Sequence, residues 1–593
     1  MRTPLHPAAW IAGAAGAALV ACRSEPMSPG REAWWARVDA AQAGLRCQPS
    51  LWQWTLHGAD ELQPGLVQVE PGVSTAAVIG SLVAALEHPA PEEEPEAPAV
   101  RAGLAVALGQ LSDDRLQVGL GPERVERAIR ELLARVRTAP RVVSLAELAR
   151  DWRAGAVAIV DARPSALFLG WPAPDEPPPL SERTGHAPGA LHVDAGWLGG
   201  VGWAGWDGEP ERRREAREQG RAALARIGFP QGKRLIVVGE EPLQARLVAM
   251  ALRELGREAG WLEVPFADWR ADPDLPLERC PNYQALVDPG WVHALVRGET
   301  PVRAWRVLDV AWDDPSGWQA GHVPGAQFFD TNWVERPPLW NLVPAEELGA
   351  RLAALGIGPH TTVVVYGQPT MAATRVALAL RWWGVEDVRL LDGGLRAWLA
   401  AGLPLERGRE PLRADGGEPV QPGDSESDLR PGPSERDLRR GQHPLRPELI
   451  QSLADAKRLL ADPGARLVSV RSWAEQCGET SGYDEIAARG RIPGDTWGHG
   501  GSDAEHMQDY EDPDGTLRSP FEVRDRLWAP WGVTAARRVS FYCGTGWRAS
   551  QAWFVAWLLG WEQAGVFDGG WKEWTLDPQN PIATGPPTPP AAR

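Results

Sequence analysis

The chain has 593 residues, a length that suggests about four domains, and its hydrophobic fraction of 44% is ordinary for globular proteins with a sizeable core. Its formal net charge is -17 and no basic stripe stands out, which argues against nucleic acid as a main partner. The five cysteines show neither a Cys-x-x-Cys pair nor a Cys/His cluster with zinc spacing, so we expect no metal and no other cofactor.

The N-terminal segment has the pattern of a secretory signal. Arg2 supplies a positive start, and an apolar, alanine-rich run from Ala8 to Ala21 follows, too short for a comfortable membrane span. Its end, Leu19-Val20-Ala21-Cys22, resembles a bacterial lipobox, in which the cysteine is lipidated. We therefore expect a lipoprotein signal peptide over residues 1–21, lipidation of Cys22, and membrane attachment through this anchor alone. The protein would then lie on the periplasmic side of the cell envelope, at the outer membrane if the cell has two. The alternative is an ordinary signal peptide with an incidental cysteine.

Residues 22–140 form a region of unknown class. The segment from Glu92 to Pro98 is polar and broken by prolines, which predicts a loop. The segment from Glu123 to Val136 places apolar side chains near helical spacing, which predicts an amphipathic helix. We expect a mostly helical extra region between the signal and the part of the chain that follows.

From about residue 141 the chain repeats one plan three times, and this repetition matters more than any one element. Each copy has a buried strand, a Gly-x-x-Pro-Gly turn and a second apolar strand. The first strands are residues 157–163, 307–310 and 467–471; the turns begin at Gly185, Gly321 and Gly490; the second strands are residues 235–239, 362–366 and 539–542. The second and third copies close on Asp-Gly-Gly-x-x-x-Trp, which starts at Asp392 and Asp568.

Strands that alternate with helical runs predict a parallel sheet covered by helices on both faces, so the predicted fold class is α/β. We place three domains at residues 141–278, 284–406 and 447–583. Residues 407–446 are rich in Pro, Gly, Ser, Asp and Arg and poor in apolar side chains, which predicts a linker. We expect residues 584–593 to form a disordered tail.

The second strand of the third copy runs into Cys543-Gly544-Thr545-Gly546-Trp547-Arg548, and an apolar helical run follows. Gly544 and Gly546 let the loop turn back without Cβ clashes. Loop amides and the helix N-terminus would then point at the sulfur, and Arg548 adds a cation, so the loop favours thiolate over thiol. A loop at the carboxyl end of a strand in an α/β sheet is also a favoured anion site. The implied chemistry is a thiolate that accepts a group from an anionic donor.

This six-residue loop resembles the active-site loop of rhodaneses, the thiosulfate and mercaptopyruvate sulfurtransferases, and in particular that of bacterial enzymes with three rhodanese domains in one chain. The order of strand, Gly-His-x-Pro-Gly turn, strand-loop and closing Gly-Gly motif is also similar to the rhodanese domain, over residues 141–583. The resemblance implies that Cys543 takes a sulfane sulfur from thiosulfate, or from mercaptopyruvate, as a persulfide. Residues 544–548 would bind this small sulfur-containing anion, and a thiol or cyanide would accept the sulfur.

The resemblance also implies supporting roles for Arg471, at the end of the first strand, and for Asp568, before the closing Gly-Gly. A structural ion pair is the alternative for each. Ser469 and Arg491 replace the Asp and the His usual at their positions. Only the third copy keeps a cysteine, since the equivalent strands lead into Gly239-Glu240-Glu241-Pro242 and Gly367-Gln368-Pro369-Thr370, so we expect the first two copies to be inactive.

Two other functions compete with sulfur transfer. The degenerate copies and the N-terminal region are also consistent with a persulfide-binding or sulfur-sensing lipoprotein that turns over little. A cysteine phosphatase or arsenate reductase is disfavoured, because related phosphatases carry one more residue between Cys and Arg. Cys477 lies near Arg471 in sequence and is a candidate resolving thiol for Cys543.

Overall fold

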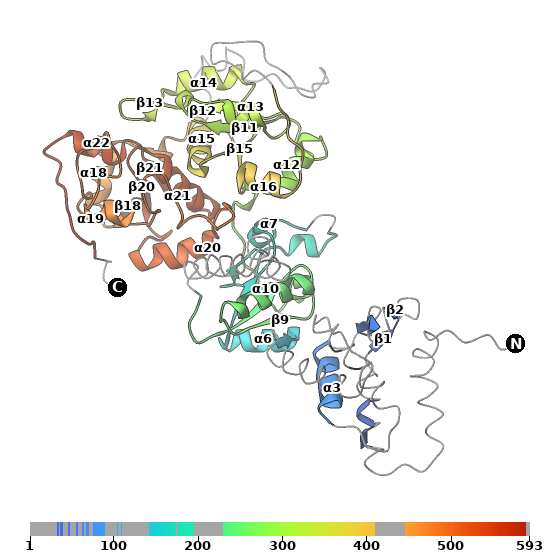
Figure 1. Ribbon diagram of the computed structural model, residues 1–593. Coiled ribbons are helices and arrows are strands. Elements are labelled where there is room, and N and C mark those ends of the chain that lie inside the picture. The colour runs from blue at the N-terminus through green and yellow to red at the C-terminus, as the bar shows by residue number, and fades with distance from the viewer. Residues whose placement is uncertain are drawn as a thin grey trace. The chain divides into compact units, whose positions relative to one another are not determined.

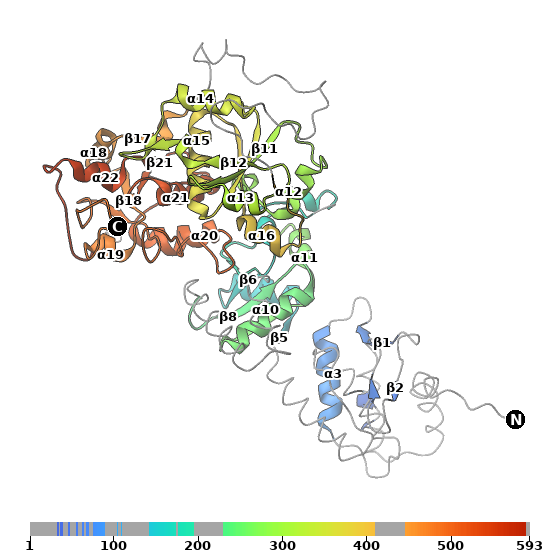
Figure 2. The same ribbon diagram turned by 45° about the horizontal axis from the view of Figure 1, so that its top comes forward.

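The structure is a computed structural model, shown in Figures 1 and 2. It describes residues 141–173, 176–194, 229–408 and 445–588 continuously, and before residue 141 only short elements and single residues between 33 and 108. The predicted signal peptide, Cys22, the predicted helix over residues 123–136, almost all of the predicted linker and the end of the predicted tail lie outside the described residues. The chain divides into two compact units, residues 1–162 with 231–272 and residues 163–230 with 273–593.

Unit 1 combines an N-terminal part with strands of the first copy. The N-terminal part contains helix α3 (Thr75–Glu87) and two antiparallel pairs, β1 (Leu45–Cys47) with β4 (Val67–Val69) and β2 (Thr55–Leu56) with β3 (Leu62–Gln63). The first copy contributes parallel strands in the order β5–β9–β8–β6. These are β5 (Arg141–Val143), β6 (Val157–Asp161), β8 (Arg234–Val238) and β9 (Ala259–Leu262), and helices α6 (Leu145–Arg153), α10 (Pro242–Glu254) and α11 (Phe266–Ala271) belong to the same unit. Residues 235–238 of β8 are all buried, as expected for a parallel strand covered on both faces.

Unit 2 contains the second and third copies, drawn from green to yellow and from orange to red in Figure 1. Each copy forms a five-stranded parallel sheet, and the two strand orders are the same. The second sheet is β10 (Leu286–Val287), β16 (Asp387–Leu391), β15 (Thr362–Gly367), β11 (Trp305–Ala311) and β12 (Gln327–Asp330). The third sheet is β17 (Ile450–Gln451), β21 (Ala564–Phe567), β20 (Arg538–Tyr542), β18 (Ala465–Ser469) and β19 (Thr496–Trp497). The predicted α/β class is confirmed.

Helices and short turns connect the strands of unit 2. The helices of the second copy are α12 (Pro289–Val296), α13 (Ser316–Ala320), α14 (Ala345–Ala354), α15 (Thr370–Trp383) and α16 (Gly394–Ala400). Those of the third are α18 (Leu453–Ala461), α19 (Trp473–Cys477), α20 (Pro520–Glu522), α21 (Trp547–Leu558) and α22 (Gly570–Leu576). Unit 2 also holds α7 (Ser165–Leu169), β7 (Leu191–His192) and a hairpin of β13 (Glu335–Arg336) and β14 (Asn341–Leu342). In the described part of the chain, no helix has the length and apolar character needed to cross a membrane.

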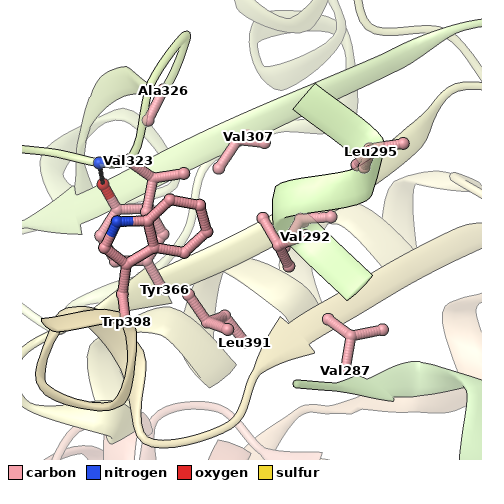
Figure 3. Close-up of a cluster of buried hydrophobic side chains, with 10 residues drawn as sticks. Val287, Val292, Leu295, Val307, Val323, Ala326, Tyr366, Leu391 and Trp398 are labelled. Atoms are coloured by element: carbon pink, nitrogen blue, oxygen red, sulfur yellow. Dashed lines mark hydrogen bonds between the residues drawn. The ribbon is translucent and has the colours of Figure 1, made fainter. Parts of the chain in front are cut away.

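The core of the second copy shows how the repeated motifs pack (Figure 3). Tyr366 at the end of β15 and Trp398 of the closing motif lie in one buried cluster with strand and helix residues. The Tyr366 hydroxyl accepts the Val323 N–H of the Gly-His-x-Pro-Gly turn over 3.0 Å. In the third copy Tyr542, Ile492 and Trp574 occupy the corresponding places in a second buried cluster. The motifs therefore recur because each one supplies core residues to its own sheet.

The second and third copies hold each other by equivalent contacts. Helix α15 packs on helix α21. The Asp568 carboxylate accepts the Leu342 N–H over 2.7 Å, and the Asp392 carboxylate accepts the Leu517 N–H over 2.7 Å. Each Asp-Gly-Gly motif therefore binds the backbone of the other copy, and the two copies are built as a reciprocal pair.

Candidate functional site

The loop after β20 joins the central strand of the third sheet to helix α21. Cys543 follows the strand at once, and the helix begins at Trp547. Gly546 has a φ of 112°, which glycine adopts without strain, and its N–H donates to Cys543 Sγ over 3.1 Å. The cysteine is only 1% exposed and lies at the positive end of a helix of 12 residues. A backbone donor and the helix dipole therefore both stabilise negative charge on the sulfur.

The Asp-Gly-Gly turn of the third copy holds the same loop through its backbone. The Trp571 N–H donates to the Cys543 carbonyl over 2.8 Å, and the Lys572 N–H donates to the Gly544 carbonyl over 3.1 Å. Gly570 has a φ of 52°, and a Cβ atom there would lie 2.6 Å from the Cys543 carbonyl oxygen. Only glycine allows two backbones to approach so closely, which explains the glycine at this point of the motif.

Arg548 is bound to protein partners through both terminal nitrogens. Its Nη1 donates to Glu475 Oε2 over 2.8 Å and to the Asp503 carbonyl over 3.0 Å. Its Nη2 donates to Glu475 Oε1 over 2.9 Å and to the Tyr483 hydroxyl over 2.7 Å. The buried Nε has no hydrogen-bond partner among the described residues. The Nε–H is therefore the N–H group of this guanidinium that remains free to donate a hydrogen bond to a bound ligand.

Glu475 of α19 joins the two predicted site arginines. Besides Arg548 it accepts a hydrogen bond from Arg471 Nε over 3.2 Å, and all three side chains are fully buried. Burial alone would raise the pKa of Glu475, but the charge and hydrogen bonds of Arg548, the charge of Arg471 and the Ser472 N–H lower it to about 2. Glu475 is therefore ionised at neutral pH, and one buried carboxylate balances two arginines.

Arg471 also fixes the segment that carries Tyr483. Its Nη1 donates to the Gly490 carbonyl over 2.8 Å, its Nη2 donates to the Ser481 carbonyl over 3.2 Å, and its guanidinium lies 4.8 Å from the centroid of the Trp571 ring. These contacts give Arg471 a supporting position behind Tyr483 and the closing motif.

Tyr483 lies directly against the cysteine loop. Its hydroxyl accepts the Gly544 N–H over 3.1 Å as well as the bond from Arg548. A Cβ atom at Gly544 would lie 2.2 Å from Cζ of this ring, so the ring occupies the space that any other side chain would need. Burial raises the pKa of Tyr483, and the charges of Cys543 and Glu475 raise it further against the opposing effect of Arg548. The hydroxyl therefore stays protonated at neutral pH.

Asp568 and Trp547 belong to a second buried network. Asp568 Oδ1 forms an ion pair with Arg375 Nη2 at 2.7 Å, and Glu335 accepts hydrogen bonds from Arg375 Nε, over 2.8 Å, and from the Trp547 indole N–H. Glu335 and Arg375 both come from the second copy. The structure thus places Asp568 in an ion pair that links the two copies, while Arg471 pairs with Glu475.

The remaining predicted residues have simpler surroundings. Thr545 is half-buried in the middle of the loop. Cys477, at the end of α19, is a buried free thiol, as are Cys280 and Cys543. Burial raises the pKa of Cys477, and the charge of Glu479 adds to this effect while Arg491 opposes it. This environment disfavours a reactive thiolate at Cys477.

Comparison with known proteins identifies the chain. Residues 288–401 and 452–577, which belong to the second and third copies, match the rhodanese-like domain. The chain is 37% identical over 433 residues to the thiosulfate sulfurtransferase YnjE of Escherichia coli (strain K12), a match that covers 72% of this chain and 88% of the relative. The chain belongs to the rhodanese family. This rhodanese is accordingly a thiosulfate sulfurtransferase homologue, as the loop and the repeats predict.

Solved structures support the same identification. The crystal structure of YnjE aligns with this rhodanese at a TM-score of 0.61 and 36% identity, over 76% of this chain and 97% of that chain. The anaerobic ergothioneine biosynthesis enzyme from Chlorobium limicola, solved in complex with its natural substrate trimethyl histidine, aligns at a TM-score of 0.62 and 31% identity, over 76% of this chain and 100% of that chain. The structural similarity therefore covers nearly the full length of both solved proteins.

At one position where the third copy lacks the residue usual in the family, a nearby side chain takes over the missing hydrogen bond. Ser469 stands where the second copy has Asp309, whose carboxylate bonds to Tyr366. In the third copy the Tyr542 hydroxyl instead donates to Asp495, which directly follows the Gly-x-x-Pro-Gly turn, over 2.6 Å. A carboxylate partner for the strand-end tyrosine is thus kept, although a different segment supplies it.

Four residues that surround the loop of this rhodanese are not predicted from the sequence: Glu475, Tyr483, Glu335 and Arg375. Two of them have a local signal. Ser472-x-x-Glu475 is a capping-box pattern, which the structure confirms, and Tyr483 is one of only five tyrosines in the chain. Glu335 has none, because its contact with Trp547 spans 212 residues of sequence.

Proposed function

We propose that this rhodanese transfers a sulfane sulfur from thiosulfate to a small acceptor through a persulfide on Cys543, with the first two copies inactive. The observation that carries the proposal is the Gly546 N–H placed 3.1 Å from a buried sulfur at the start of α21. A preorganised backbone donor stabilises the anionic sulfur before and after transfer without reorganisation, as oxyanion donors do in acyl transfer.

The reaction divides into two displacements. In the first, the Cys543 thiolate attacks the outer sulfur of thiosulfate, and the sulfur–sulfur bond of the donor breaks with its electron pair going to sulfite. In the second, a thiolate or cyanide attacks the outer sulfur of the Cys543 persulfide and releases the Cys543 thiolate. The loop amides of residues 545–548 and the free Arg548 Nε–H are the groups that would bind the donor anion, because the Gly544 N–H already donates to the Tyr483 hydroxyl. With mercaptopyruvate as donor, pyruvate would leave in place of sulfite.

A methylated histidine is a second candidate acceptor. The Chlorobium limicola enzyme, which aligns over its whole length with this rhodanese, is described with trimethyl histidine as natural substrate. The buried charges around the loop are paired with one another, three arginines with three carboxylates. These groups are Arg375, Arg471 and Arg548, and Glu335, Glu475 and Asp568. The persulfide sulfur would replace a ring hydrogen, whose proton would return to Cys543.

Intact mass spectrometry tests this function. The reduced protein is mixed with thiosulfate and, separately, with mercaptopyruvate, and a gain of one sulfur atom is expected with thiosulfate, with no gain in Cys543→Ala. Cyanide, a low-molecular-weight thiol and trimethyl histidine are then added to the persulfidated protein, and the acceptor that removes the sulfur is identified by its product. A persulfide that forms but reacts with none of them would favour the binding or sensing function instead. No persulfide with either donor would reject the proposal.

We also propose that the mature protein is held by a lipid on Cys22, facing the periplasm. The lipobox-like pattern before Cys22 supports this proposal. In cells fed a labelled fatty acid, the wild-type protein is expected to carry the label in the membrane fraction, and Cys22→Ala is expected to carry none. Equal labelling of the two proteins would reject the anchor.

A further inference from the structure

The second copy has lost the cysteine but touches the loop of the third. Glu335 on β13 and Arg375 on α15 are 2% and 0% exposed, and both contact residues at the start of α21. Buried charges of this kind cost folding energy unless each one is paired and hydrogen-bonded. The partners of Glu335 and Arg375 therefore indicate how the second copy affects the cysteine loop of the third.

Glu335 holds the side chain of Trp547. One carboxylate oxygen accepts the indole N–H of Trp547, and the other accepts Arg375 Nε over 2.8 Å. Burial raises the pKa of Glu335 to about 7, against the charge of Arg375 and the hydrogen bonds from Trp547 and Arg375, while Asp568 raises it further. The Trp547 N–H is thus one of the few groups that favour the ionised carboxylate, and the two side chains depend on each other.

Arg375 lies against the backbone of Gly546. A Cβ atom on Gly546 would lie 2.9 Å from Arg375 Nη1 and 3.0 Å from its Cζ, so the guanidinium occupies the place of the missing side chain. Its Nη2 is fixed by Asp568 at 2.7 Å and by the Trp340 carbonyl at 3.0 Å. Gly546 is the residue whose N–H donates to Cys543 Sγ. The guanidinium therefore blocks movement of the residue that binds the sulfur.

We propose that Glu335 and Arg375 are positioning residues for sulfur transfer at Cys543, and that the second copy is retained because it supplies them. This inference rests on the proposed function, since it concerns the same persulfide. Glu335 fixes Trp547 and Arg375 fixes Gly546, so two consecutive residues of the loop are held from the neighbouring copy. The Gly546 N–H is then aimed at the sulfur before the donor arrives, and preorganisation of this kind lowers the barrier of the chemical step.

A single-turnover experiment tests the proposal. Persulfide formation on the purified full chain is followed by quenched intact mass at several thiosulfate concentrations, for Glu335→Ala, Trp547→Phe and the double variant. If Glu335 acts through Trp547, each single change lowers the maximum rate by roughly 10- to 100-fold, a typical effect of misplacing catalytic groups. The double variant is then no slower than the slower single variant, and the half-saturating thiosulfate concentration changes little.

Two further variants separate positioning from simple attachment of the copies. Glu335→Gln keeps an oxygen that can accept the Trp547 N–H and is expected to recover most of the rate, even if Glu335→Ala folds poorly. Asp392→Asn changes a buried carboxylate that also joins the two copies but binds Leu517, and it is expected to react at the wild-type rate. The proposal would be overturned if the rate losses of Glu335→Ala and Trp547→Phe multiplied in the double variant. It would also be overturned if Asp392→Asn lost as much of the rate as Glu335→Ala. Failure of the wild type to form a persulfide would instead reject the proposed function on which it rests.

Discussion

Replacing Glu475 with glutamine is expected to lower the free energy of unfolding by about 3–5 kcal/mol, the usual cost of removing one partner from a buried ion pair. Glu475 is the carboxylate between Arg548 and Arg471, and all three side chains are buried. A glutamine keeps the shape but leaves two buried guanidinium charges without a counter-charge. Urea unfolding followed by tryptophan fluorescence at pH 7 measures the difference.

The pH dependence of this difference follows from the pKa of Glu475. The folded-state pKa is about 2, below the ordinary value of 4.5, so the folded protein binds a proton on Glu475 less readily than the unfolded chain does. The stabilisation by the carboxylate is therefore fully present above pH 4.5 and is lost as the pH falls through about 2. The gap between the wild type and Glu475→Gln should stay constant above pH 4.5 and narrow in more acidic buffers.

Glu347→Gln provides the matched control for Glu475→Gln. Glu347 also binds two arginines, Arg336 and Arg351, but its side chain is 32% exposed. Exposed pairs of this kind contribute about 0–1 kcal/mol, because water already solvates both charges. If Glu475→Gln were no more destabilising than Glu347→Gln, the charge of Glu475 would not be what stabilises its buried network with Arg548 and Arg471.

Gly544→Ala is expected to slow persulfide formation by roughly 100-fold, comparable with other misplacements of catalytic groups by about one ångström. The new methyl group would meet the Tyr483 ring at 2.2 Å, so either the ring or the loop has to move. Movement of the ring breaks the hydrogen bonds that its hydroxyl accepts from Gly544 and Arg548. Quenched intact mass after mixing with thiosulfate measures the rate.

Two comparisons show whether the Tyr483 ring causes the effect of Gly544→Ala. Gly317→Ala places a methyl group where no atom lies within 4 Å, and it should leave the rate unchanged. Tyr483→Ala removes the ring, and adding Gly544→Ala to it should then cost little more. A full additional loss in that double variant would show that the loop needs Gly544 for another reason, such as its own backbone conformation.

The plan of the molecule and the place of the reactive loop can both be predicted from the amino-acid sequence. The threefold repeat of strand, turn and strand predicted α/β sheets, and Cys543 at the end of such a strand, with Gly546 before the following helix, predicted a sulfur at a helix N-terminus. These features depend on neighbours within a few residues, where periodicity and glycine conformation leave a readable pattern. The resemblance of the loop from Cys543 to Arg548 predicted the family for the same reason.

The side chains that surround this loop become known only from the folded structure. Arg548 is balanced by Glu475, 73 residues away, and Asp568 pairs with Arg375 of the second copy, while Trp547 is bound by Glu335. The alternatives for Arg471 and Asp568 could not be separated from sequence, because a buried charge is identified by its partner and not by its neighbours along the chain. Such partners are set by which strands and copies pack together, and the sequence carries no local periodicity that records this packing.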